Sequence, residues 1–281
     1  MKLPNFVIPH LINKEFTSTG LDSLRYCLNK QHFQNFPHQI IYKYNARGFR
    51  DKEWPTDLQN CVWCVGDSFT VGLGLPFDLT WPQQLQTLLD CPVITVAMDG
   101  ASNQWIFRKT QAIQQEIKPK YIVTMWSYFH RREDIDETID DLARRKHGSP
   151  DTEVEDFLLF ESLITQLDSK QLVNLLIPNF HNIDAIQKIW DDIRDISWPE
   201  TLPNSLTSLP KEIYKELFTY HKIGNHLDLL LTLKNRLQCI QEKFVFLDYK
   251  FEDFARDYHH FGQTTSCLIA RKVFNAINRV P

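Results

Sequence analysis

The sequence predicts an α/β fold in which helices cover both faces of a sheet of five mainly parallel strands. One observation is a series of short apolar runs rich in Val, Ile and Leu, a composition typical of strands buried on both faces. The other is a series of intervening segments with apolar residues on one helical face, which supply the crossovers that parallel strands need. A chain of 281 residues can bury the core of one such domain and still carry insertions.

Each expected strand is bounded by turn residues or by a segment of helical spacing. Helices with one apolar face are expected from Trp81, from about Asn103, and after Gly262. The expected strands are Cys61–Val65, Val93–Ala97, Tyr121–Met125, Leu172–Ile177 and Phe244–Leu247.

The chain divides into an N-terminal extension and a main domain. Residues 1–57 precede the first strand, show little periodicity, and are expected to pack on the core formed by residues 58–281. Residues 179–242 lie between the fourth and fifth strands and exceed a minimal crossover, so we expect a helical and loop insertion there. This insertion is either a lid or binding loop, or an ordered spacer or oligomer contact.

Composition argues against several classes of partner and location. A formal net charge of -4 gives no electrostatic basis for binding nucleic acid or an anionic membrane. Residues 1–20 lack the unbroken apolar region of a signal peptide, and no run approaches transmembrane length. A cytoplasmic location is therefore expected.

Neither a metal nor a cofactor is expected. The six cysteines are scattered, which favours reduced thiols over a disulfide framework. Cys61 and Cys64 form a C-x-x-C pair, but in an extended strand their side chains point to opposite faces. His259 and His260 are adjacent, yet neither has a partner at ligand spacing.

The candidate nucleophile is Ser68, which follows the first strand. A serine just beyond the carboxyl end of a parallel strand lies in the crevice where open α/β sheets bind ligands. A serine hydroxyl needs a base, and the base needs an orienting carboxylate. Asp257 and His260 supply both from one short loop. The alternative interpretation of Ser68 is a capping residue in a turn.

These stretches resemble a known family. Gly66-Asp67-Ser68-Phe69, a block around Gly100, and Asp257-x-x-His260 followed by Gly262 are similar to the first, second and last blocks of the SGNH/GDSL hydrolases. The similarity is discontinuous and runs from about residue 58 to the end. It implies a flavodoxin-like three-layer α/β/α sandwich and ester or acyl chemistry. It also implies that Ser68 is the nucleophile, His260 the base and Asp257 its partner.

The resemblance also implies an oxyanion hole. The backbone N–H groups of Ser68 and Gly100 would form part of it, because a glycine lets the backbone approach a bound oxyanion closely. Asn103, three residues after Gly100, either adds a side-chain donor or caps the following helix.

After the third strand the chain departs from the family pattern. SGNH enzymes usually carry Gly-x-Asn-Asp here, and this chain has Trp126-Ser127-Tyr128-Phe129-His130-Arg131-Arg132. Losing one oxyanion donor typically lowers turnover ~100- to 1000-fold, unless Ser127, His130 or Asn103 replaces it.

The same stretch is the expected substrate-binding rim. Its aromatic and cationic side chains suit a sugar ring or an anionic substrate, and the residues assigned to this role are Trp126, Ser127, His130 and Arg131. In the alternative interpretation, Trp126 packs in the core and the arginines cap or pair with nearby acidic residues.

A further segment, Asn45-x-x-Gly48-Phe49-Arg50, resembles one found ahead of the Gly-Asp-Ser block in some bacterial and phage SGNH-like proteins. Arg50 either braces the site or meets an anionic group, or the segment is a surface hairpin that packs Phe49 on the core. We favour the hairpin.

The function predicted from the sequence is that of a serine esterase or acyl hydrolase acting on a small ester, with an O-acetylated carbohydrate as the leading candidate. An acyltransferase would use the same residues. The alternative from another class is a non-hydrolytic SGNH-like glycan-binding or structural protein, such as a component of a phage virion. The sequence leaves the oligomeric state open.

Overall fold

The computed structural model describes residues 6–128, 131, 153–177, 239–240 and 242–279. Its main sheet has the order β4-β3-β5-β6-β7, and every neighbouring pair is parallel. This is the flavodoxin-like order, in which the first strand of the sheet lies inside and the chain winds outward in both directions. The strands are β3 (Val62–Gly66), β4 (Val93–Ala97), β5 (Tyr121–Trp126), β6 (Leu172–Leu176) and β7 (Val245–Leu247). All five predicted strands are confirmed.

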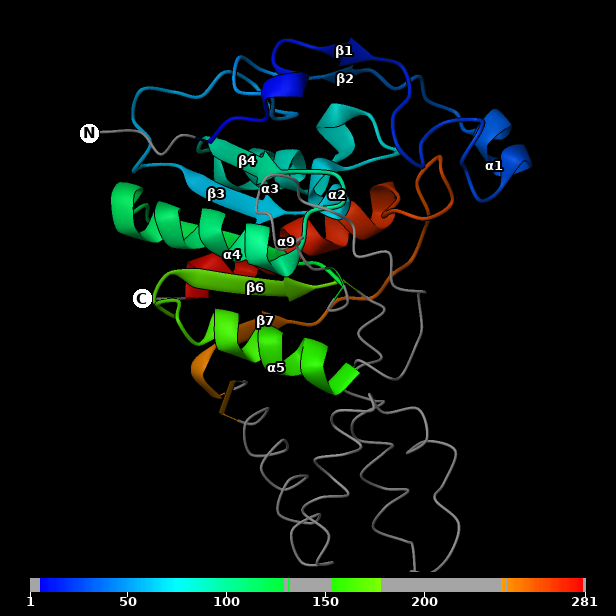
Figure 1. Cartoon of the computed structure of the whole chain (residues 1–281). Helices are drawn as coiled ribbons and strands as arrows, with labels where there is room; N and C mark the ends of the chain where they lie inside the picture. The colour runs from blue at the N-terminus through cyan, green and yellow to red at the C-terminus, as the bar shows by residue number, and fades with distance from the viewer. Residues whose placement is uncertain (1–5, 129–130, 132–152, 178–238, 241, 280–281) are drawn as a thin grey trace, which may run out of the picture.

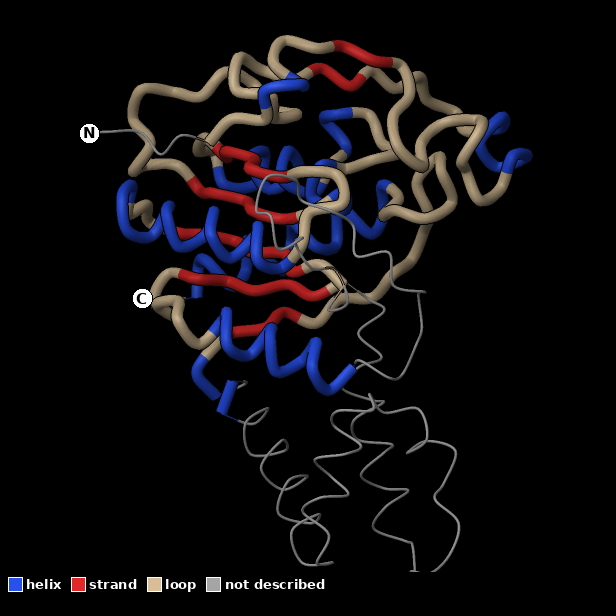
Figure 2. The backbone as a smooth tube through the Cα atoms, in the orientation of Figure 1, coloured by secondary structure: helices blue, strands red, loops and turns tan. Residues whose placement is uncertain are grey.

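Helices cover both faces of this sheet, as predicted (Figure 1). Helices α3 (Trp81–Leu89) and α9 (Gln263–Arg279) pack on each other and on one face. Helices α4 (Asn103–Ala112), which continues as a π-helical turn over Ile113–Ile117, and α5 (Glu153–Ile164) lie on the other. Figure 2 shows the strands in red between these two helical layers. The fold is therefore a three-layer α/β/α sandwich.

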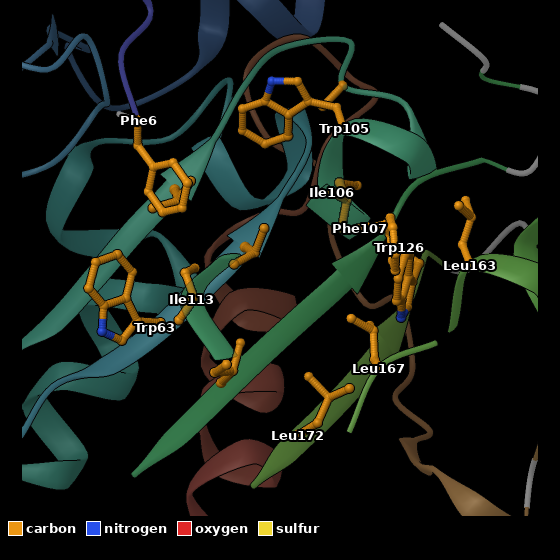
Figure 3. Packing of buried hydrophobic residues seen from close by; sticks show 14 of the residues in the cluster. Phe6, Trp63, Trp105, Ile106, Phe107, Ile113, Trp126, Leu163, Leu167 and Leu172 are labelled. Atoms are coloured by element: carbon orange, nitrogen blue, oxygen red, sulfur yellow. The ribbon is translucent and has the colours of Figure 1, made fainter. Parts of the chain in front are cut away.

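The two faces of the sheet carry separate hydrophobic clusters because side chains alternate along each strand. On β3, Trp63 joins the cluster under α4 and α5, and Cys64 joins the cluster under α3 and α9. The first cluster also contains Trp105, Ile106, Trp126 and Leu172, shown in Figure 3. The second contains Trp81, Leu85, Val123, Ile269 and Val273.

The segment before β3 lies along the β4 edge of the sheet (Figure 1). It contains a 3-10 turn (Pro9–Leu11), the antiparallel pair β1 (Glu15–Phe16) and β2 (Tyr42–Lys43), and α1 (Lys30–Asn35). Phe6, Ile8 and Phe49 from this segment enter the cluster under α4. Tyr42 and Tyr44 pack instead with Val71 and Leu73, which follow β3, and with Ala97, the last residue of β4. The segment thus contacts the carboxyl end of the sheet as well as its edge.

An aspartate protects the edge strand β4. The Thr95 N–H group points outward from β4 and donates to Asp51 Oδ2 at 2.8 Å, while the Lys52 N–H group donates to Oδ1 at 2.8 Å. These bonds satisfy edge groups that would otherwise be open to another chain. Burial raises the pKa of Asp51 from 3.8 to about 7, against the opposing effect of the two N–H groups.

Part of the predicted insertion, residues 179–238 and 241, lies outside the described residues, and so do Phe129, His130 and Arg132. No helix among the described residues is long and apolar enough to cross a membrane. In the same part of the chain, no three His, Cys, Asp or Glu residues gather where they could hold a metal ion. All six cysteines are free, and burial raises the pKa of Cys61 to about 11 and that of Cys64 further above its ordinary value.

We predict that the Asp51 side chain makes folding stability pH-dependent. Because its folded-state pKa lies near 7, the folded protein holds a proton between about pH 4 and about pH 7 that the unfolded chain has released. This contribution to stability is therefore lost as pH rises through that window. Asp51→Asn cannot titrate, so urea unfolding should show its stability rising relative to wild type over the window. Parallel pH profiles for the two proteins would contradict this prediction.

Candidate active site

The loop after β3 places Ser68 at the carboxyl edge of the sheet. Asp67 is the N-cap of the short helix α2 (Ser68–Val71), and its Oδ1 accepts the Phe69 N–H group at 3.0 Å. Ser68 is the first residue of α2, so its N–H group has no carbonyl partner within the helix. Both the hydroxyl and this N–H group of Ser68 are available for chemistry.

The loop after β7 brings two further groups to Ser68. The ring of His260 lies with Nε2 2.8 Å from Ser68 Oγ and Nδ1 2.5 Å from Asp257 Oδ2. Because an ionised carboxylate only accepts, Nδ1 carries the proton, and Nε2 is left to accept from the serine hydroxyl. All three side chains are at most 1% exposed. The structure therefore brings together the three residues that the sequence predicted as catalytic.

The local turn fixes the carboxylate. Asp257 Oδ1 accepts the N–H groups of His259 and His260, each at 3.0 Å. Tyr258, which follows Asp257, has a left-handed backbone with φ 61°. Burial alone would raise the pKa of Asp257, but the hydrogen bonds and the charge of His260 outweigh it and hold the pKa below its ordinary value. The carboxylate stays ionised beside the imidazole, as a base-orienting group must.

Aromatic rings surround the imidazole. The Phe69 ring centroid lies 4.6 Å from that of His260 and 4.6 Å from that of Phe261. His259 packs on the same face, 4.8 Å from His260. Burial, and then the charge of His260, lowers the pKa of His259 to about 4, so this second ring is neutral at pH 7. It adds packing next to the base without adding a competing charge.

Close packing joins the two loops. Gly74 follows α2 with φ 77°, and a Cβ there would lie 2.6 Å from the Cβ of Ala255. The Gly74 carbonyl accepts the Arg256 N–H group at 2.9 Å, so the backbone after the serine lies directly against the backbone before Asp257. Any side chain at position 74 would force the two loops apart.

The N-terminal segment reinforces the same contact through a buried carboxylate. Arg256 donates from Nε and Nη2 to the two oxygens of Asp22, at 2.7 and 2.5 Å. Tyr42 donates its hydroxyl to Asp22 Oδ2 at 2.5 Å and accepts the Gly74 N–H group at 2.8 Å. This connection between segments far apart in sequence was not predicted, because none of these residues belongs to a recognisable local motif.

Arg50 braces the loop after α2. Its side chain is buried, and the guanidinium donates to the carbonyls of Gly72 at 2.6 Å and Leu75 at 2.7 Å while lying over the Tyr42 ring at 4.2 Å. Phe49 packs in the core, as expected, but the segment is not the surface hairpin that we favoured. Buried carbonyl groups need donors, and Arg50 supplies them.

Ser127 and Arg131, both predicted to bind substrate, contact Asp67. The Ser127 hydroxyl donates to Asp67 Oδ2 at 2.6 Å, and Arg131 Nη1 forms an ion pair with the same oxygen at 2.7 Å. Arg131 Nη1 also donates to Ser127 Oγ at 2.9 Å. The acidic partner of Arg131 is thus the residue before the serine, an acid that sequence reasoning treated only as part of a motif.

Asn103 takes neither of its predicted roles. Its Oδ1 accepts the Ser127 N–H group at 2.8 Å, and its Nδ2 donates to the carbonyls of Ser127 and Tyr128 at 3.2 and 3.4 Å. These contacts use the amide in holding the chain after β5, so the expectation that it donates to an oxyanion is corrected. The helix cap is the neighbouring Ser102, whose side chain accepts the Trp105 N–H group.

Trp126 is not at the rim. Its side chain is fully buried, its Nε1 donates to Asn174 Oδ1 at 3.0 Å, and its ring packs edge-on against Phe160 at 5.2 Å. The position in the cluster under α4 and α5 (Figure 3) corrects the prediction that it contacts substrate and supports the packing alternative. Gly100, the predicted backbone donor, is buried in the loop after β4 with φ 75°.

We predict that Trp126→Ala lowers stability without changing substrate affinity. Emptying a buried tryptophan site typically costs about 3–5 kcal/mol of unfolding free energy. Urea unfolding measures this loss, and KM for a small ester, measured where the variant is folded, should stay at the wild-type value. Trp126→Phe keeps most of the packing and should lose less stability. A raised KM with unchanged stability would restore the substrate-binding interpretation.

No family model and no curated protein matches the chain. Solved structures similar to it include a G-D-S-L family protein from Desulfitobacterium hafniense, with 11% identity, 77% of this chain and 98% of that chain covered, and a TM-score of 0.42. The esterase EstA from Pseudoalteromonas sp. has 12% identity, coverage of 78% and 97%, and a TM-score of 0.41. A carbohydrate acetylesterase family member from Sinorhizobium meliloti has 15% identity, coverage of 78% of this chain and 97% of that chain, and a TM-score of 0.39.

The solved structures similar to this chain also include carbohydrate esterases of family 2. Because the identities are 11–15% and the TM-scores lie below 0.5, these similarities do not assign an activity to this chain. The strand order of the sheet, and not this likeness, establishes the flavodoxin-like fold.

Proposed function

We propose that this protein is a serine ester hydrolase with Ser68, His260 and Asp257 as its catalytic residues. The observation that carries the proposal is the pair of contacts made by one imidazole, at 2.8 Å to the serine oxygen and 2.5 Å to the aspartate oxygen. This arrangement of nucleophile, base and orienting carboxylate is the one that acyl transfer by serine requires. Burial of all three groups strengthens the electrostatic interactions among them.

In the proposed reaction, Ser68 Oγ attacks the ester carbonyl carbon while its proton passes to His260 Nε2. The carbonyl electron pair moves onto the oxygen, which the N–H groups of Ser68 and Gly100 stabilise. His260 returns the proton to the alcohol oxygen as the ester C–O bond breaks. A water molecule, deprotonated by His260, then attacks the acyl carbon. The bond from that carbon to Ser68 Oγ breaks, His260 returns the proton to Oγ, and the acid leaves. Asp257 keeps the imidazole in the required tautomer throughout.

The substrate we propose is a small ester, with an O-acetylated carbohydrate as the leading candidate. Ser68 is 1% exposed, so a short acyl group fits its surroundings better than a long chain. The Arg131 guanidinium is paired with Asp67, which favours a neutral ester over an anionic one. An acyltransferase would use the same residues with an acceptor alcohol in place of water.

A second candidate function is that of a binding module, which binds a ligand without hydrolysing it. It is favoured by the lack of an asparagine in the stretch Ser127–Arg132 directly after β5, and by the Asn103 amide, which is occupied by backbone groups. Both candidates have the same fold, and an activated serine distinguishes them.

We predict covalent labelling of Ser68 by a fluorophosphonate probe. A serine that donates to a neutral imidazole is activated as a nucleophile, and peptide mapping should find the adduct on Ser68 in wild type and none in Ser68→Ala. Circular dichroism should show both proteins folded. A folded wild-type protein that stays unlabelled would favour the binding module instead.

We also predict that Asp257→Asn lowers kcat on p-nitrophenyl acetate by about 10⁴-fold with little loss of folding stability. An asparagine at this position donates to Nδ1, reverses the tautomer and removes the acceptor from Ser68. Steady-state kinetics with thermal unfolding on the same samples measures both. Activity near the wild-type level would show that Asp257 does not orient the base.

A further inference from the structure

Of the three side chains considered as the missing oxyanion donor, the structure eliminates Ser127 and Asn103, and His130 lies outside the described residues. The Ser127 hydroxyl has one proton, which it donates to Asp67 at 2.6 Å. The Asn103 amide donates to two backbone carbonyls. The family pattern would place an asparagine after β5, and this chain has none there.

Arg131 is held by the residue that precedes the proposed nucleophile. Its Nη1 donates to Oδ2 of Asp67, the residue before Ser68. The other oxygen of Asp67 accepts the N–H group of Phe69, the residue after Ser68. The guanidinium also lies over the Tyr128 ring at 5.0 Å, and that ring packs against Phe69, which contacts His260. Its charge contributes, after burial and His260, to lowering the pKa of His259. Arg131 is therefore anchored to Asp67, the residue before Ser68, and to Tyr128, whose ring reaches His260 through Phe69.

Part of this guanidinium is unused. Both hydrogen bonds that its guanidinium donates to described side chains come from Nη1. Arg131 Nε is buried and has no hydrogen-bond partner among the described residues. A buried donor without an acceptor is costly, and such groups in native proteins call for an explanation. An acceptor that arrives with the substrate provides one.

We infer that Arg131 is the third oxyanion donor of this site, replacing the missing asparagine. The inference rests on the proposed esterase function. As Ser68 Oγ bonds to the carbonyl carbon and its proton moves to His260, the carbonyl electron pair becomes a full charge on the oxygen. The guanidinium donates to this oxygen and keeps all its protons, since arginine is not deprotonated in proteins. Asp67 holds Nη1 in place, so the donor is preorganised and costs no reorientation.

The competing explanation is that Arg131 only neutralises the buried Asp67 carboxylate. Arg131→Gln removes both the donor and the counter-ion, so by itself it cannot separate the two roles. The double variant Asp67→Asn/Arg131→Gln replaces the ion pair by a neutral amide pair and leaves no charge without a partner. Lys170→Gln removes an exposed cation just before β6, at the opposite end of the sheet, and serves as a matched control.

The experiment measures kcat and KM on p-nitrophenyl acetate, and inhibition by a small boronic acid that forms a tetrahedral adduct with the serine. We expect kcat to fall ~100- to 1000-fold in Arg131→Gln and to stay low in the double variant, with KM little changed. Boronic acid affinity should fall in parallel, because the adduct is anionic. Arg131→Lys should retain intermediate activity, and Lys170→Gln should match wild type.

Recovery of wild-type kcat in the double variant would show that Arg131 acts only as a counter-ion and would overturn the inference. So would full activity in Arg131→Gln. Thermal unfolding of each variant separates loss of fold from loss of chemistry, and the double variant keeps the test valid if the single one unfolds. A wild-type protein that neither labels nor hydrolyses overturns the proposed function itself, whereas an active wild type with an active double variant overturns only the role of Arg131.

Discussion

The contact between Ser68 and His260 joins residues 192 positions apart in the chain, and it depends on the rest of the architecture to keep Ser68 Oγ and His260 Nε2 2.8 Å apart. A parallel sheet does this because the carboxyl ends of all its strands meet at one edge. Ser68 follows the inner strand β3, and the Asp257–His260 loop follows the last strand, β7. Two strands, β5 and β6, lie between them, so the loop after β7 has to cross the end of the sheet to reach the serine. Its return is fixed by the antiparallel bridge between Phe254 and Phe261 and by the contact of Gly74 with Ala255.

Three fully buried carboxylates hold the loops at this edge. Asp67 and Asp22 have partners from distant segments, and the partners of Asp257 lie within its own turn. Asp257 orients the base, Asp67 ties the serine loop to the chain after β5, and Asp22 ties the N-terminal segment to the loop before Asp257. A buried carboxylate left without such partners is strongly destabilising, so these contacts favour a single arrangement of the loops. The N-terminal segment is therefore part of the site's support, although it contributes none of the three proposed catalytic groups.

Local sequence patterns predicted the fold and the proposed catalytic residues but not the contacts that support them. Strands such as Val93–Ala97 are evident from apolar runs alone, and Ser68, Asp257 and His260 lie in recognisable blocks. Arg256 with Asp22 and Arg131 with Asp67 are pairs of common residues, and no periodicity relates them. The N-terminus of α9 was also not predictable from neighbouring residues. Its Thr264 and Thr265 N–H groups are accepted by Asp253, 11 and 12 residues earlier in the chain. The substrate-binding role predicted for Trp126 was wrong because a side chain at the end of a strand can point into the core or toward the rim. The identity of the residue does not determine which.

The pairing of Arg131 with Asp67 also changes what this cation can select. An unpaired arginine at the rim would attract anionic substrates, as the sequence alone led us to consider. With Asp67 at 2.7 Å, the pair has no net charge in the resting site and gives an anionic group little advantage over a neutral ester. Negative charge appears on the carbonyl oxygen only during attack, and N–H groups that are already fixed interact most strongly at that moment. An arginine held by a carboxylate thus has the property that catalysis requires of an oxyanion donor, since it distinguishes the transition state from the ground state.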